Sequence, residues 1–322
     1  MTEKKLFWSG NFNWRYGDKG IVIGGKEYGI RELFPELYFL TSEGCTLEKI
    51  KASFPDIDAE KTEKAVRFLL DMWVLADRVQ SPDKLFERQY SFYPRRGEYP
   101  DDILLHSELI EELRKKALDR QSASGSGELI RLESSVRVKP ERRSIRNFAA
   151  DKQVTVKQFS KLLDTMRQER SGDEITYAYP SAGGLYPIDI YIYVKSGRVE
   201  GIEGGIYEYL PAEHSLRPVS GEQIPAGAHY YNNKAIFSSS AFSMYFFYDT
   251  DASMPKYHGL GYYYAVIDSG IMLGKLSDSA HQTGLGSCII GVLNYSKAEK
   301  YFGCGENKIY LHCMEFGIPS EQ

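Results

Sequence analysis

The chain has 322 residues, of which 42% are apolar and 26% charged, a composition typical of globular proteins. This length predicts two domains rather than one small module. A net charge of −4 provides no basic surface for a phosphate backbone, and no segment reaches the ~18 apolar residues of a membrane span, so neither nucleic acid nor membrane is an expected partner. The four cysteines form no CxxC pair and the polar amino terminus lacks a signal-peptide core, so we expect free thiols and a cytoplasmic protein.

The amino-terminal part of the chain predicts a small unit of strands and helices. Gly24-Gly25 separates two β-prone runs and predicts a hairpin. Thr46 caps a short predicted helix and Asp58 a longer one, followed by a returning strand. The apolar face of the longer helix is predicted to contain Ala65, Phe68, Leu69 and Met72. Residues 1–100 therefore resemble a winged-helix domain, which serves either to recognise a peptide or DNA or as an extension of the main domain.

A helical run at 101–120 and a Ser/Gly-rich stretch at 121–127 predict a helix and a linker over residues 101–138. Residues 139–322 then mix strand and helix signals without a repeating βαβ order, which predicts an α+β domain with a largely antiparallel sheet. Capping boxes at Thr155 and Ser296 predict two helix starts. The other predicted elements are strands at 188–194, 206–210, 241–248, 288–290 and 308–316 and a helix at 261–283 that ends at Gly284.

Several familiar catalytic motifs are absent from the sequence. Gly284-Leu-Gly286 lacks the third glycine of a dinucleotide-binding loop, and there is no Walker A sequence. No metal site is expected, because adjacent strand residues such as His312 and Cys313 point to opposite faces and Cys304 is the only other nearby ligand. No nucleophile elbow surrounds the candidates for a hydrolase triad, which are His258, His281, Asp268 and Ser269.

Two motifs indicate a ligand site. Arg142-Arg-Ser-Ile-Arg146 concentrates three guanidiniums and a hydroxyl in five residues, which predicts either a phosphate site or a solvent-exposed basic turn. Tyr179-Pro-Ser-Ala-Gly-Gly-Leu-Tyr-Pro187 combines small residues with a glycine pair. Such a loop allows a flat ligand to approach the backbone closely, and it is also typical of an ordinary tight turn before a strand.

Together with Leu285-Gly-Ser-Cys-Ile-Ile-Gly291, these motifs resemble the nitroreductase-like flavoproteins, and PSAGGLYP is similar to their SagB-type branch, the azoline oxidases. The resemblance covers about 139–317 and implies a nitroreductase-like FMN-binding fold in an obligate homodimer with the cofactor at the interface. It implies that the FMN phosphate is bound by Arg142, Arg143, Ser144 and Arg146. It implies that the second chain contacts the flavin with Pro180, Ser181, Ala182, Gly183 and Gly184, and that a third contact lies at Ile290 and Gly291.

The SagB-type branch also carries a Lys-Tyr pair linked to azoline oxidation, and Lys256-Tyr257 stands in the matching place. Converting a thiazoline to a thiazole removes a proton α to the carbonyl and a hydride from the next carbon, so the site needs a base as well as FMN. The sequence leaves open which of the two residues is the base. Other tyrosines and histidines near these motifs are the next candidates, namely Tyr177, Tyr179, His258 and Tyr262.

The chain departs from the branch pattern at Leu260-Gly261-Tyr262-Tyr263 and at Gly274-Lys275, where the branch has arginines and a Gln-Asn pair. This departure concerns the substrate more than the redox chemistry. The resemblance thus implies an FMN-dependent azoline oxidase for a peptidyl thiazoline or oxazoline. The peptide would be ribosomal or nonribosomal, as in bacillamide-type pathways, and presented by a peptidyl carrier protein or a synthetase/cyclase complex. The alternatives are an NAD(P)H-dependent nitro or quinone reductase and a flavin-binding docking subunit without activity.

Overall fold

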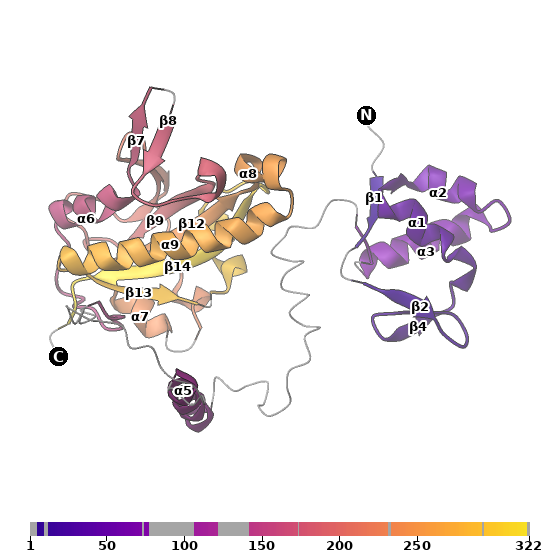
Figure 1. Cartoon of the computed structure of the whole chain (residues 1–322), viewed down its shortest axis with the longest axis horizontal. Helices are drawn as coiled ribbons and strands as arrows, with labels where there is room; N and C mark the ends of the chain where they lie inside the picture. The colour runs from indigo at the N-terminus through magenta and orange to yellow at the C-terminus, as the bar shows by residue number, and fades with distance from the viewer. Residues whose placement is uncertain are drawn as a thin grey trace, which may run out of the picture. The chain divides into compact units, whose positions relative to one another are not determined.

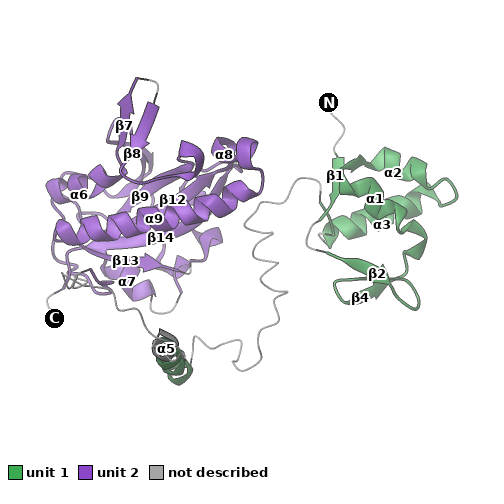
Figure 2. Ribbon diagram, viewed as in Figure 1, with its two compact units in different colours: residues 1–135 green, residues 136–322 purple. Residues whose placement is uncertain are grey.

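The computed structural model describes residues 5–9, 12–72, 74–76, 106–121, 142–172, 174–230, 233–291 and 293–320. The chain divides into two compact units, Met1–Ser135 and Val136–Gln322 (Figures 1 and 2). The predicted Ser/Gly-rich linker after Gln121 lies outside the described residues, as do the expected boundaries near residues 100 and 138. In the described part of the chain, no helix combines the length and apolar character needed to cross a membrane.

The first unit contains two small antiparallel sheets and several short helices. One sheet places β1 (Lys5–Trp8) between β5 (Cys45–Thr46) and β6 (Leu75–Ala76), and the other is the meander β2 (Trp14–Tyr16), β3 (Ile21–Ile23) and β4 (Lys26–Tyr28). The helices among the described residues of this unit are η1 (Arg31–Leu33), α1 (Glu36–Ser42), α2 (Leu47–Ser53), α3 (Ala59–Asp71) and α5 (Ser107–Gln121). The predicted hairpin is confirmed, since Gly24 and Gly25 turn between β3 and β4 with φ of 58° and 80°.

The predicted start of α3 is confirmed, and its predicted apolar face is confirmed for Leu69 and Ala65 but wrong for Phe68 and Met72. Asp58 caps the helix by accepting a hydrogen bond from the Glu60 backbone N–H at 2.6 Å. The buried side chains of α3 are Thr62, Val66 and Leu69. Two of the side chains predicted to be buried, Phe68 and Met72, are instead 39% and 37% exposed. The core of the first unit meets the helix on the Val66 side, whereas Phe68 contacts Tyr28 of β4 ring edge to ring face, with centroids 5.4 Å apart.

The second unit is built on a six-stranded antiparallel sheet with the order β11-β10-β9-β12-β14-β13. Its inner strands are β10 (Gly205–Leu210), β9 (Ile188–Val194), β12 (Phe242–Asp249) and β14 (Lys308–Gly317). The edge strands are β11 (Ser215–Ser220) and β13 (Gly286–Ile290). The predicted α+β class with an antiparallel sheet is therefore confirmed.

Helices cover both faces of this sheet. One face packs against α6 (Val156–Leu163) and the long helix α9 (Leu260–Gln282), which crosses the sheet in Figure 1. The opposite face carries an aromatic cluster covered by α7 (Asn233–Ser239) and short 3-10 turns. The predicted capping box of α6 is confirmed, because Thr155 Oγ1 accepts from the Gln158 N–H and Gln158 Oε1 accepts from the Thr155 N–H, each at 3.2 Å.

The second predicted capping box, at Ser296, is wrong. Ser296 Oγ donates to Asn294 Oδ1 at 2.6 Å, within two short 3-10 turns, η6 (Tyr295–Lys297) and η7 (Glu299–Tyr301). A local side-chain hydrogen bond thus replaces the expected cap. The elements that the sequence pattern did not predict are η3 (Asp164–Met166), β7 (Gln168–Ser171), β8 (Glu174–Tyr177), η4 (Ala182–Gly184), η5 (Ala226–Ala228), α7 and α8 (Thr250–Tyr257), besides β11. The hairpin β7–β8 projects from the body of the unit (Figure 1).

Candidate active site

The PSAGGLYP loop joins β8 to β9 and is held by a buried carboxylate of α9. Asp268 Oδ2 accepts hydrogen bonds from Ser181 Oγ at 2.6 Å and from the Ala182 backbone N–H at 3.2 Å. Ser181 Oγ in turn accepts from the Tyr186 N–H at 3.0 Å, which closes the loop on itself. Because Asp268 is only 5% exposed, these bonds are shielded from water and fix the loop to the long helix.

The glycine pair of this loop has a backbone conformation that favours glycine. Gly183 and Gly184 have φ of 65° and 67°, in the left-handed region. Both residues are exposed, as is Pro180 before them, and a Cβ built on Gly184 would meet no atom within 4 Å. The loop therefore offers exposed backbone without side chains, which is what a flat ligand needs for close approach.

The structure brings the Lys-Tyr pair to this loop. Lys256 and Tyr257 form the last turn of α8, and a Cβ built on Gly183 would overlap Tyr257 Oη and lie 2.8 Å from Lys256 Nζ. The Tyr257 ring packs edge-on against Tyr264 of α9, with centroids 5.1 Å apart. Both polar groups thus lie directly beside the glycine backbone.

The turn that follows the pair is strained. His258 has φ of 51° and ψ of −137°, a combination that residues with a side chain rarely adopt, and its N–H donates to the Met254 carbonyl at 2.8 Å. Backbone strain of this kind persists only where surrounding packing maintains it, and it is frequent at functional sites. The strained turn sets the direction in which the end of α8 meets α9.

The arginine-rich segment lies along the edge strand β13. The Ile145 N–H donates to the Ser287 carbonyl at 2.9 Å, and Ser144 pairs with Ser287 in a parallel bridge. The three guanidinium side chains, which belong to Arg142, Arg143 and Arg146, are exposed, and none of them forms an ion pair with a carboxylate among the described residues. Three guanidiniums beside a serine hydroxyl are a donor set that suits a phosphate group.

The third predicted contact adjoins this segment. Ile290, the last residue of β13, is buried, and Gly291 after it is exposed with open space where a Cβ would stand. At the start of the strand, a Cβ on Gly286 would lie 2.8 Å from Ile145 Cβ. Glycine at this position is what allows the arginine-rich segment to approach β13.

Within one chain, the arginine-rich segment and the PSAGGLYP loop are held at different places on α9. The loop is bound at Asp268, whereas Ser277 Oγ lies 3.4 Å from Ser287 Oγ beside the arginine-rich segment. Nine residues of helix separate these two anchors, a distance of about 13 Å at a rise of 1.5 Å per residue. The structure therefore groups the loop with Lys256 and Tyr257, and groups the arginines with β13.

The neighbouring tyrosines considered as alternative bases are poorly suited to this role. Tyr177, Tyr179 and Tyr186 form an aromatic cluster, in which the ring centroids of Tyr177 and Tyr186 are 4.2 Å apart. Burial raises the pKa of Tyr177 to about 12 and that of Tyr179 still further. A phenol with a raised pKa is even less ionised at neutral pH, so these two hydroxyls are weak candidates for a base.

Sequence reasoning missed the residues that hold the site together. It considered Asp268 only for a hydrolase triad, whereas the structure shows a loop anchor. A carboxylate on the buried side of a largely apolar helix is the signal that could have revealed this role. The cluster of Asp189, Asp249 and Lys308 next to the loop was also missed.

Comparisons with known proteins identify the family of the second unit. Residues 140–317 match the sequence profile of the Nitroreductase family. The chain is 33% identical over 86 residues to MJ1384 of Methanocaldococcus jannaschii, described as a nitroreductase, covering 26% of this chain and 40% of that protein. It is 26% identical over 152 residues to the microcin B17-processing protein McbC of Escherichia coli, covering 43% of this chain and 53% of McbC. The matches thus span about half, or less, of the length of these two relatives.

Among solved structures, the chain resembles a component of the E. coli microcin synthetase McbBCD complex with truncated pro-MccB17 bound. The TM-score is 0.57 with 21% identity, over 65% of this chain and 82% of that one, which establishes a similar fold. The matched region of the family profile contains the whole six-stranded sheet, the PSAGGLYP loop and the whole arginine-rich segment. Because that profile covers more than half of the sequence, the chain belongs to the nitroreductase family.

Proposed function

We propose that this protein is an FMN-dependent oxidase that converts a peptidyl azoline, preferably a thiazoline, to the corresponding azole. The observation that carries the proposal is the position of Lys256 and Tyr257 directly against Gly183 of the PSAGGLYP loop. A general nitroreductase needs no base at this place, whereas aromatisation of an azoline does. Membership of the nitroreductase family and the similarity to McbC support the same reaction class.

The described residues fit an FMN cofactor. Arg142, Arg143, Ser144 and Arg146 would bind its phosphate, and the exposed glycine backbone of Gly183 and Gly184 would lie along the flavin. When bound, FMN supplies the acceptor for the hydride that leaves the azoline ring. The remaining task of the protein is to hold the azoline ring and to remove the proton α to the carbonyl.

We assign the proton transfer to the Lys-Tyr pair. Lys256 Nζ and Tyr257 Oη face the same point of the loop, and Lys256 Nζ lies 5.0 Å from the centre of the Tyr257 ring. One of these groups accepts the proton and the other, by hydrogen bonding, orients it or the substrate carbonyl. The Tyr257 ring is packed against Tyr264 of α9, which limits its movement.

An exposed apolar surface on α9 supports the proposal of a homodimer. On its exposed side, from before the Asp268 anchor to shortly before Ser277, α9 carries a stripe of apolar and small residues, hereafter the α9 stripe. It consists of Tyr263, Val266, Ile267, Gly270 and Gly274. Val266 and Ile267 are 44% and 45% exposed, and the two glycines would allow another helix to approach closely. A second copy packed on this stripe would bring the loop of one chain to the arginines of the other.

A peptide substrate must be presented by a partner. The similar E. coli structure is a synthetase complex with a peptide bound, which supports a synthetase/cyclase complex or a peptidyl carrier protein as the partner of this chain. The first unit contains none of the residues assigned to FMN, and we propose that it contributes to docking of that partner. Identifying the partner that this protein binds would show whether the peptide is ribosomal or nonribosomal.

Mass spectrometry tests the proposed function. The purified protein, loaded with FMN in aerobic buffer, is incubated with a synthetic peptide that bears one thiazoline, and the product is expected to lose two hydrogens. Tyr257→Phe serves as the matched control. A protein that leaves the thiazoline intact but bleaches its flavin rapidly with NADPH would be a nitro or quinone reductase, and a colourless protein that does not take up FMN would contradict both enzymatic functions.

A further inference from the structure

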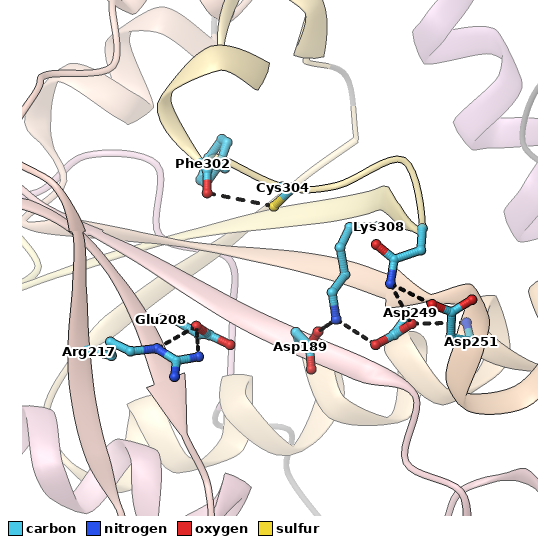
Figure 3. Close-up of polar contacts among 9 residues, drawn as sticks. Asp189, Glu208, Arg217, Asp249, Asp251, Phe302, Cys304 and Lys308 are labelled. Atoms are coloured by element: carbon cyan, nitrogen blue, oxygen red, sulfur yellow. Dashed lines mark hydrogen bonds and ion pairs between the residues drawn. The ribbon is translucent and has the colours of Figure 1, made fainter.

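Three chain segments that lead into the candidate site meet at one lysine, the first residue of β14 (Figure 3). Lys308 Nζ forms ion pairs with Asp189 and with Asp249, and the distance to Asp249 Oδ2 is 2.6 Å. The Lys308 side chain is only 18% exposed. Because the cluster is largely removed from water, its charges interact more strongly than an ion pair at the surface.

Each of the two carboxylates belongs to a segment that carries part of the site. Asp189 lies two residues beyond Pro187, the end of the PSAGGLYP loop. Asp249 is the N-cap of α8, where it accepts a hydrogen bond from the Asp251 N–H at 2.9 Å. The Asp249 N–H donates to the Pro187 carbonyl at 2.8 Å, so the exit of the loop and the start of α8 already touch at the lysine.

Asn307, the residue before Lys308, also binds the start of α8. Asn307 Nδ2 donates to Asp249 Oδ1 at 3.3 Å and to Asp251 Oδ2 at 3.0 Å, and the Asn307 carbonyl accepts from the Thr250 N–H at 2.9 Å. The start of β14 therefore holds the first turn of α8 by three hydrogen bonds besides the ion pair.

Helix α8 connects the Lys308 cluster to Lys256 and Tyr257. It has eight residues, about 12 Å of helix, with Asp249 before its first turn and Lys256 and Tyr257 in its last. Lys308 thus joins two segments at one end, namely the chain from Gly183 to Asp189 and the helix α8 with its N-cap Asp249. At the other end, Tyr257 meets Gly183.

We propose that Lys308 is a positioning residue, whose ammonium joins Asp189 to Asp249 and thereby holds α8 against the PSAGGLYP loop so that Lys256 and Tyr257 reach Gly183. This role rests on the proposed function insofar as the pair is catalytic. Without the cation, the half-buried carboxylates of Asp189 and Asp249 would face each other. Their repulsion and the loss of both ion pairs would move α8 away from the PSAGGLYP loop while leaving the sheet itself intact.

Lys308→Met removes the charge and keeps the length of the side chain. The matched control is Arg217→Met, which removes the cation of the Arg217–Glu208 pair in the same sheet, away from α8 (Figure 3). Both are compared with the wild-type holoenzyme by steady-state kinetics on a synthetic thiazoline peptide and by hydrogen–deuterium exchange.

For Lys308→Met we expect a kcat at least tenfold lower with KM within twofold, and exchange in α8 at least tenfold faster with β12 unchanged. Arg217→Met should match the wild type within twofold, and Lys308→Arg should restore kcat to within about threefold.

The two readouts separate this proposal from the proposed function. If the wild type does not oxidise the thiazoline, the proposed function fails, and exchange in α8 alone decides whether Lys308 holds the helix. Unchanged exchange in α8 of Lys308→Met overturns the positioning role, and so does equal acceleration in α8 and β12, which would show general destabilisation. Should Lys308→Met be insoluble, Asp189→Asn keeps the Lys308–Asp249 pair and is expected to show the same selective change in α8 at smaller amplitude.

Discussion

Gly183 and Tyr257 lie so close together that the glycine cannot be replaced by any other residue without moving the tyrosine, since a Cβ at Gly183 would overlap Tyr257 Oη. The two residues are far apart in the sequence and belong to the two segments to which we assign the proposed azoline oxidation. Their contact joins two separate motifs, so that the proposed base would stand beside the backbone on which the flavin would lie.

Gly183→Ala is therefore expected to impair catalysis by displacing the Lys-Tyr pair. The left-handed backbone costs alanine about 1 to 2 kcal/mol, and the collision adds to it. We expect kcat for thiazoline oxidation to fall at least tenfold. Gly197→Ala is the control, because Gly197 has a similar φ of 69° but open space around its Cβ position. Equal activity of the two variants, measured per bound FMN, would show that the contact with Tyr257 has no catalytic role.

Tyr257→Phe and Lys256→Ala should each retain FMN and the oligomeric state but lose turnover. General-base catalysis contributes typically ~10² to 10⁴-fold in rate, and the change in Tyr257→Phe removes only the hydroxyl beside Gly183. Tyr207→Phe, which removes an exposed hydroxyl that donates to the Glu203 carbonyl, is the control. Stopped-flow reduction of the flavin by the substrate measures the step directly. Rates within a few-fold of wild type for both variants would place the base elsewhere, first at His258 or Tyr262.

The double variant Arg142→Ala/Arg146→Ala is expected to release FMN. A hydrogen bond to a charged group contributes roughly 1.5 to 3 kcal/mol, so the loss of two guanidiniums should weaken binding by tenfold or more. Titration of FMN fluorescence gives the dissociation constant. Arg170→Ala, in the projecting β7–β8 hairpin, should bind FMN as the wild type does. Unaltered affinity of the double variant would remove the arginine-rich segment from the phosphate site.

Ile267→Glu should convert the protein to monomers that lose FMN. A charge placed in the middle of the α9 stripe would have to be buried against the second chain without a partner, which is costly. Light scattering with absorbance detection reports mass and flavin together. Gln282→Glu, at the exposed end of the same helix, is expected to leave both unchanged. A wild-type monomer that retains its flavin would contradict the shared site.

Local signals in the sequence determined much of the second unit. The Thr155 capping box, the apolar runs of β9 and β12 and the glycine that ends α9 act within a few residues of each other, so they predict elements whatever the rest of the chain does. The same holds for the hairpin at Gly24 and Gly25. The arginine-rich and PSAGGLYP segments also carry their chemistry in contiguous residues and could be identified without a structure.

Only the tertiary structure decided which of these elements meet. The contact of Tyr257 with Gly183, the anchoring of Ser181 by Asp268 and the ion pairs of Lys308 all join segments distant in the sequence, and they exist because β9, β12 and β14 are neighbours in one sheet. On α3 the apolar spacing correctly predicted Leu69, but only the packing of the core on the Val66 side decided that Phe68 and Met72 remain exposed. A sequence pattern reports on neighbours within a turn of helix or a strand, whereas burial and long-range ion pairs depend on packing of the whole unit.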